Sequence, residues 1–187
     1  MKNLFYTIII LLSLVFCSCS YISGVFSKKP DVLIKKDFNG EGIAVLTFSR
    51  YGHSLPSDIG RTAADKLTDA LFLVNKFNVI DRSKINDAQA EVDITNTEFL
   101  SGDKIQQIGL KLKASYLILG RIDLLSEKEY LSIEAKQELG ISFRIISVAD
   151  TEVLGVANYH RDIDDNIPEE MDYMISQIVI EINKQRE

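Results

Sequence analysis

The sequence predicts an α/β domain: a small mixed sheet with a parallel β-α-β-α-α-β core, followed by an antiparallel β-hairpin and a C-terminal helix. Two observations predict the parallel core. Apolar runs of strand length occur at residues 43–48, 76–80 and 116–124, and the segments between them carry apolar residues at helical spacing. A third observation predicts the hairpin: residues 130–148 alternate between apolar and polar, residues 149–151 are typical of a turn, and residues 152–160 return as a strand.

Each predicted helix begins with a recognisable signal. Residues 59–74 place their apolar side chains on one face, and Ser57 before them is a suitable N-cap. Ser83 and Ser101 are the predicted caps of the next two helices. Pro168 suits the first turn of the closing helix. Within the alternating segment, Gly140 is the residue at which the long strand is expected to bend.

The N-terminus has the features of an export signal. Lys2 is followed by the almost wholly apolar residues 4–16 and then by two cysteines one residue apart. This stretch resembles a bacterial lipobox, in which the residue before the lipidated cysteine is small. Cys19, preceded by a serine, is therefore the predicted lipidation site, and Cys17, preceded by a phenylalanine, is the alternative. By resemblance to bacterial sorting rules, Ser20 predicts an outer-membrane lipoprotein with its domain in the periplasm.

An uncleaved membrane anchor is the alternative interpretation of this N-terminus. Residues 4–27 contain no charge and are long enough to span a bilayer. Two lysines follow immediately, on the side that would be exported, and this disfavours the anchor because positive residues collect on the cytoplasmic side. We therefore predict a signal peptide at residues 1–18, a lipidated tether without regular structure at residues 19–40, and the folded domain at residues 41–187.

Charge and cysteine content disfavour two classes of protein. The chain of 187 residues carries 21 basic and 27 acidic side chains, and its net charge of −6 disfavours a nucleic-acid binder. Both cysteines of the chain lie where the predicted signal peptide meets the tether, outside the domain, so the domain is expected to fold without a disulfide framework.

No motif of a known catalytic class is present in the sequence. It lacks the G-x-x-x-x-G-K-[ST] phosphate loop and the G-x-S-x-G nucleophile turn, and its two histidines stand far apart, so we predict no enzyme, cofactor or metal site. Ligands of open parallel sheets bind beyond the carboxyl ends of the strands. The candidate ligand or partner contacts at those ends are Arg50, Tyr51, Asp81, Arg82 and Arg121. An Asp81–Arg82 pair that holds two loops together is the structural alternative to a ligand contact.

Several segments resemble the periplasmic α/β domain of the curli assembly and secretion lipoproteins (the CsgG-like family). They occur in the family's order at residues 42–48, 59–74, 77–82, 114–122, 141–148 and 150–155. The same plan recurs in lipoprotein activators of peptidoglycan synthases and in flagellar accessory lipoproteins. The chain departs from the family in lacking the glycine of the usual Thr-Gly-Glu turn. It also leaves no room, at residues 126–140 and 161–167, for two transmembrane hairpins.

The resemblance implies a non-enzymatic lipoprotein, held in the outer membrane by acyl chains such as palmitate. Its domain would bind envelope proteins of a secretion apparatus or serve as an accessory of a cell-wall synthase. Two alternatives remain open: a homo-oligomeric component of a curli-type secretion channel, and a small-ligand binder at the carboxyl ends of the strands.

Overall fold

The computed structural model describes residues 29–35, 42–52, 55–74, 77–92, 94, 97, 99–127, 136–163 and 166–185. Cys17 and Cys19 lie outside the described residues. In chain order the elements are β1 (Asp31–Ile34), β2 (Gly42–Val45), β3 (Ser49–Tyr51), α2 (Ile59–Leu73), β4 (Asn78–Val79), α3 (Arg82–Glu91), α4 (Gly102–Leu112), β5 (Tyr116–Glu127), β6 (Lys136–Ser147), β7 (Val153–Ile163) and α5 (Ile167–Lys184).

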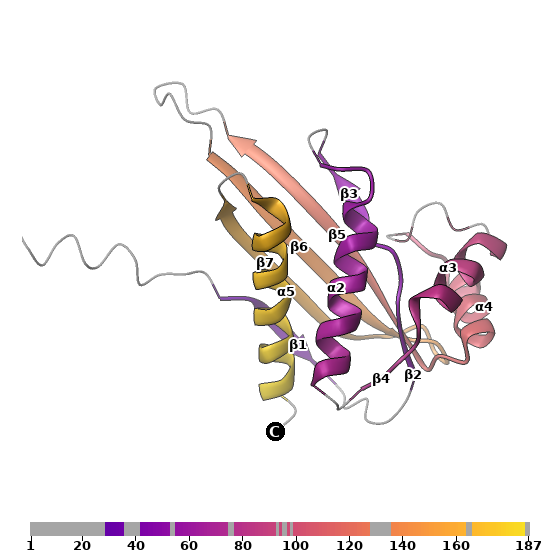
Figure 1. The fold of residues 1–187 in the computed structure, drawn as a ribbon. Coiled ribbons are helices and arrows are strands. Elements are labelled where there is room, and N and C mark those ends of the chain that lie inside the picture. Colours follow the sequence, from indigo (N-terminus) through magenta and orange to yellow (C-terminus); the bar gives the residue numbers. More distant parts are fainter. Residues whose placement is uncertain are drawn as a thin grey trace, which may run out of the picture.

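The seven strands among the described residues form one open mixed sheet in the order β1-β7-β6-β5-β2-β4, with β3 also paired to β5 (Figure 1). β2 lies parallel to β4 and β5, and β3 is parallel to β5. β5, β6 and β7 form an antiparallel meander, and β1 pairs antiparallel with β7. This arrangement confirms the predicted fold class, with its parallel core, its hairpin and its C-terminal helix.

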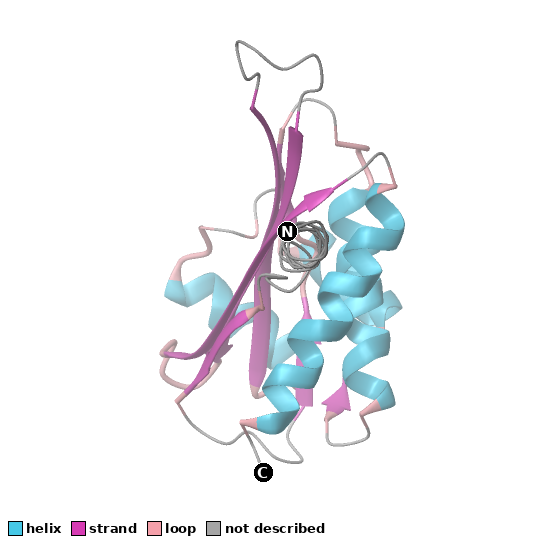
Figure 2. Cartoon of the chain, turned by 90° about the vertical axis from the view of Figure 1, so that its left-hand side faces the viewer, coloured by secondary structure: helices cyan, strands magenta, loops and turns pink. Residues whose placement is uncertain are grey.

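Helices cover the sheet on both faces, as Figure 2 shows. α2 and α5 lie side by side on one face, where the larger core cluster includes Ile118 and Ile122 of β5. α3 and α4 cover part of the other face, above Leu117 and Leu119 of the same strand. Successive side chains of a strand point to opposite faces, so β5 is apolar without alternation where both faces are covered.

The prediction of an unstructured tether up to residue 40 is wrong for Asp31–Ile34. These residues form β1 at the edge of the sheet and pair with β7, with Leu33 opposite Val156. Their exposure alternates, because Val32 and Ile34 pack on the core while Asp31 and Leu33 face outward. Four residues are too few for this alternation to be recognised in a sequence.

Three strand boundaries also differ from the prediction. β2 ends at Val45 rather than at the predicted residue 48, and Ser49–Tyr51, which lie beyond the predicted strand, return to the sheet as β3 beside β5. β7 continues to Ile163, three residues beyond the predicted end of this strand at residue 160. The pairing of β6 runs without interruption through Gly140, and its irregularity lies between Ile145 and Ile146 instead.

Two of the predicted helix caps are wrong as well. α2 begins after Asp58 rather than at Ser57, and α3 is capped by Asp81, whose carboxylate accepts a hydrogen bond from the backbone N–H of Ser83. Ser101 does occupy the N-cap position of α4, but its side chain makes no capping hydrogen bond. Pro168 lies in the first turn of α5, as predicted.

Candidate functional site

The structure brings Arg121 of β5 and Tyr51 of β3 together and places Arg50 on the other face of the sheet. Arg121 lies within β5 rather than at its end, so the predicted strand-end position is wrong; it is opposite Ser49 of β3. Its Nε donates to Asp123 Oδ2 over 2.9 Å, and its guanidinium carbon lies 5.5 Å from the centre of the Tyr51 ring. Arg50, the neighbour of Tyr51 on β3, points to the other face and donates to the carbonyl of Leu55 over 3.1 Å.

Asp81 and Arg82 do not form the predicted pair with each other. Asp81 caps α3, and the hydrogen bonds it accepts from the Ser83 hydroxyl and backbone N–H lower the pKa of its carboxyl group below the ordinary value. The Arg82 side chain instead turns back to the sheet, where its exposed fraction is only 14%.

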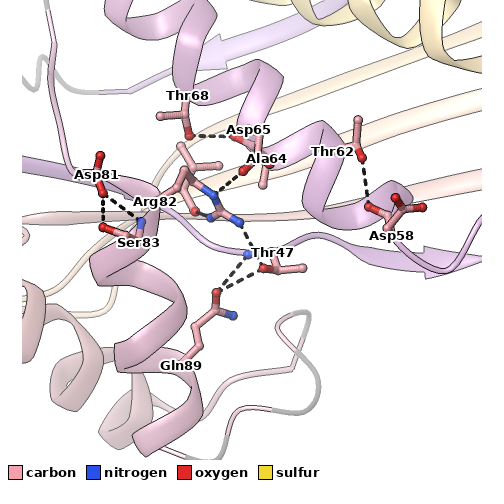
Figure 3. Close-up of polar contacts among 11 residues, drawn as sticks. Thr47, Asp58, Thr62, Ala64, Asp65, Thr68, Asp81, Arg82, Ser83 and Gln89 are labelled. Atoms are coloured by element: carbon pink, nitrogen blue, oxygen red, sulfur yellow. Dashed lines mark hydrogen bonds and ion pairs between the residues drawn. The ribbon is translucent and has the colours of Figure 1, made fainter.

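Each nitrogen of the Arg82 guanidinium is bound within the fold (Figure 3). Nε donates to Asp65 Oδ1 of α2 over 2.6 Å, Nη2 donates to Thr47 Oγ1 over 3.3 Å, and Nη1 donates to the carbonyl oxygen of Val45. Arg82 therefore joins α2, α3 and the end of β2. The carboxyl end of β2, where a parallel sheet usually receives its ligand, is occupied by this side chain.

A second set of hydrogen bonds fixes the segment between β2 and β3. Gln89 Oε1 accepts from the backbone N–H of Thr47 over 3.4 Å and from its hydroxyl over 3.2 Å. Thr97 donates to the Thr47 carbonyl over 2.5 Å and lies 3.3 Å from the Ser49 hydroxyl. Gln89 and Thr97 are both buried, so these contacts are structural and fix the conformation of the segment.

A surface of which only Arg121 was a predicted contact residue lies across β5, β6 and β7. This surface is on the face of the sheet that α3 and α4 partly cover, and no described helix covers the upper part of that face in Figure 2. We call it the open sheet face and define it by Arg121, Ser142, Arg144, Val156 and Asn158. In the register Arg121, Ser142 and Asn158 form one row across the strands, and Arg144 and Val156 lie in the next.

A shallow hollow of about 280 Å³ lies on the open sheet face. Leu119 and Phe99 line it together with the residues that define the face, and the Phe99 side chain is 75% exposed. The polar positions of β6 were a signal for this surface, since Ser142 and Arg144 fall on the polar side of the predicted alternation.

Within the described ranges, no three His, Cys, Asp or Glu side chains gather in a way that would hold a metal ion. His160 Nδ1 lies 3.6 Å from Glu138 Oε1, beside the open sheet face. Burial raises the pKa of the Tyr159 hydroxyl above its ordinary value, on the opposite, core-facing side of β7. Among the helices that the structure describes, none has the length and apolar character needed to cross a membrane.

The comparisons with known proteins establish the fold. Neither a protein-family model nor a curated protein matches this sequence. A variant of the PelC dodecamer from Paraburkholderia phytofirmans is similar over 81% of this chain and 96% of its own, with 14% identity and a TM-score of 0.55. The lipoprotein GNA1162 from Neisseria meningitidis is similar over 77% of this chain and 99% of its own, with 11% identity and a TM-score of 0.52.

These identities are too low to transfer a function, so the similarity shows the fold alone. The chain has the α/β fold found in PelC and in the lipoprotein GNA1162. The LpoB C-terminal domain from Salmonella enterica is similar with 14% identity over 70% of this chain and 88% of its own, at a lower TM-score of 0.48. The more specific resemblance to the curli assembly lipoproteins stays a prediction.

Proposed function

We propose that this chain is a non-enzymatic outer-membrane lipoprotein whose periplasmic domain binds other proteins of the cell envelope through the open sheet face. The observation that carries the proposal is this face: three long strands present ordered rows of polar and cationic side chains beyond the cover of α3 and α4. Its partner would belong to a secretion apparatus or to a cell-wall synthase, the two settings that the sequence resemblance implies.

The character of the open sheet face favours a protein partner over a small molecule. Small-molecule sites are concave and mostly apolar, and they bury most of their ligand. The hollow here is shallow and is lined by arginines, an amide and an exposed Phe99. Arginine and aromatic residues are enriched in protein interfaces, whose rims are polar.

A photocrosslinking experiment in cells tests the face. A benzophenone amino acid at Asn158, exposed on the open sheet face, should give a crosslinked adduct larger than the chain itself. The same group at Ile180, which is 47% exposed on the outer side of α5, is the matched control and should give none. Adding Arg144→Glu should reduce the Asn158 adduct several-fold, because it reverses a charge on the face. Adducts from Ile180 alone would place the partner on the helices and contradict the proposal.

A separate experiment tests the lipid anchor. Cys19→Ser should abolish labelling with a radioactive fatty acid, because the acylated side chain is removed. Cys17→Ser is the control and should leave the labelling unchanged. The reverse pattern would move the lipidation site to Cys17, and labelling of neither parent nor variants would contradict the anchor.

A homo-oligomeric secretion component is the second candidate. The observation that supports this candidate is the similarity in fold to a subunit of the PelC dodecamer. Light scattering with detergent correction on the full chain separates the candidates: a ring-sized mass favours the oligomer, and a monomer or dimer favours the protein-binding module.

A further inference from the structure

The outer edge of β1 is closed by one side chain of the same molecule. In an edge strand, alternate residues direct their backbone N–H and C=O groups away from the sheet. The backbone N–H of Lys35 points inward and donates to the carbonyl of Leu154 of β7. Because the direction alternates along the strand, Val32 and Ile34 are the residues of β1 whose backbone groups point outward. The Gln185 carboxamide accepts from the N–H of Ile34 over 3.1 Å and donates to the carbonyl of Val32 over 2.6 Å.

Gln185 thus acts as a substitute for a neighbouring strand. Its carboxamide offers one donor and one acceptor, like a peptide unit, and it binds the two groups that such a strand would bind. Gln185 follows the last residue of α5 and is exposed, so its side chain can rotate into water without breaking the core. A strand that displaced Gln185 would replace the two hydrogen bonds of one exposed carboxamide with the backbone hydrogen bonds of a continuous β-ladder.

The residues around this edge are complementary to themselves. If two copies of β1 run antiparallel about Leu33, Val32 of one copy lies opposite Ile34 of the other, so both outward-directed backbone pairs are satisfied. Asp31 then lies opposite the second copy's Lys35, and Leu33 lies opposite its counterpart. Asp31, Leu33 and Lys35 are all exposed, and the Leu33 side chain is 55% exposed. Opposite charges that face each other across an antiparallel pair are stabilising.

We infer that β1 is a self-association site: a second copy of this chain adds its β1 antiparallel to the first, displaces Gln185, and extends the sheet across a two-fold axis. The occupant is a second copy because the segment Asp-Val-Leu-Ile-Lys is complementary to an antiparallel copy of itself. In that pairing opposite charges face each other, and the outward-directed backbone groups of one copy meet those of the other. The edge is short, so the association is weak in dilute solution and is favoured where copies are concentrated. The inference does not depend on the proposed partner of the open sheet face.

Cysteine crosslinking of the full chain, in detergent and in phospholipid vesicles, tests the inferred pairing. Directly opposed residues between hydrogen-bonded pairs have Cα atoms about 4.5 Å apart, within the range that a disulfide spans. Leu33→Cys should therefore oxidise to a covalent dimer several-fold more than Leu125→Cys. Leu125 is the matched control, since it lies on another strand and is 54% exposed. The parent chain sets the background from Cys17 and Cys19.

Charge exchange gives a second test that does not need a new cysteine. Asp31→Lys places lysines opposite each other, Lys35→Asp places aspartates opposite each other, and either should weaken dimerisation about tenfold by light scattering or sedimentation. The double variant restores opposite charges and should return dimerisation to the parent level. Gln185→Ala should strengthen dimerisation, because it removes the competing carboxamide.

The opposite results would overturn the inference. Equal crosslinking at Leu33→Cys and Leu125→Cys, or a double charge variant no better than the single ones, would exclude the antiparallel register. A Gln185→Ala chain that associates no more than the parent would show that β1 accepts no second strand.

Discussion

Replacing Gly60 with alanine is expected to destabilise the domain by about 3 kcal/mol, the upper end of the usual cost of overpacking. Gly60 lies in the first turn of α2, directly against Phe48, whose backbone N–H donates to the Gly60 carbonyl over 3.1 Å. A Cβ atom at position 60 would lie 2.0 Å from the Phe48 carbonyl oxygen. That oxygen belongs to the backbone, so α2 or the segment before β3 must move.

The expected sign is the reverse of what helix propensity alone predicts, since alanine is better than glycine in a helix by about 1 kcal/mol. Gly102→Ala is the matched control, because Gly102 begins α4 and its added Cβ would meet only Thr151, at 3.5 Å. Urea unfolding should show Gly60→Ala strongly destabilised and Gly102→Ala unchanged or slightly more stable. Equal midpoints for the two variants would mean that α2 is free to move away from Phe48.

Arg82→Ala is expected to cost about 2–3 kcal/mol of the free energy of unfolding. Most of the loss comes from the acceptors on the sheet side, the Val45 carbonyl and the Thr47 hydroxyl, which lose their charged donor. The ion pair with Asp65 adds less, because the Asp65 side chain is 48% exposed and solvent screens it.

Two further variants separate the role of the guanidinium from that of its charge. Arg82→Lys keeps the charge, but a single ammonium does not reproduce the planar fork that spans three acceptors, so an intermediate loss is expected. Arg61→Ala removes an exposed arginine of α2 and should change stability by less than about 0.5 kcal/mol. If Arg82→Ala unfolds at the same urea concentration as Arg61→Ala, Arg82 is not a structural residue, and a ligand contact at the strand ends regains support.

Periodicity was enough to predict the parallel core, the hairpin and the closing helix. The apolar faces of α2 and α5 and the alternation of β6 extend over many residues, so chance matches are rare. β1 and β3 were missed because each has few residues and owes its structure to a distant partner. Residues 31–34 pair with β7, which lies at the other end of the chain. Local sequence carries little information about such pairing.

The predicted site residues show a similar limit. Asp81 and Arg82 are neighbours in the sequence, but their side chains point in different directions. Asp81 binds Ser83, and Arg82 binds Asp65. Arg121 and Tyr51 do come together, because β3 pairs with β5 in parallel. The open sheet face depends on where α3 and α4 stop covering the sheet, and no single residue in the sequence marks that point.

The position of β1 also decides how mechanical load enters the domain. Any pull on the chain from its N-terminal side reaches β1 before any other described strand or helix. β1 is held by its four paired positions on β7, by Gln185 and by the packing of Val32 and Ile34 on the core, whereas β5, β6 and β7 share long ladders. Under tension β1 should therefore detach first and leave the meander and its helices folded. A moderate pull would thus expose the edge of β7 long before the core opened.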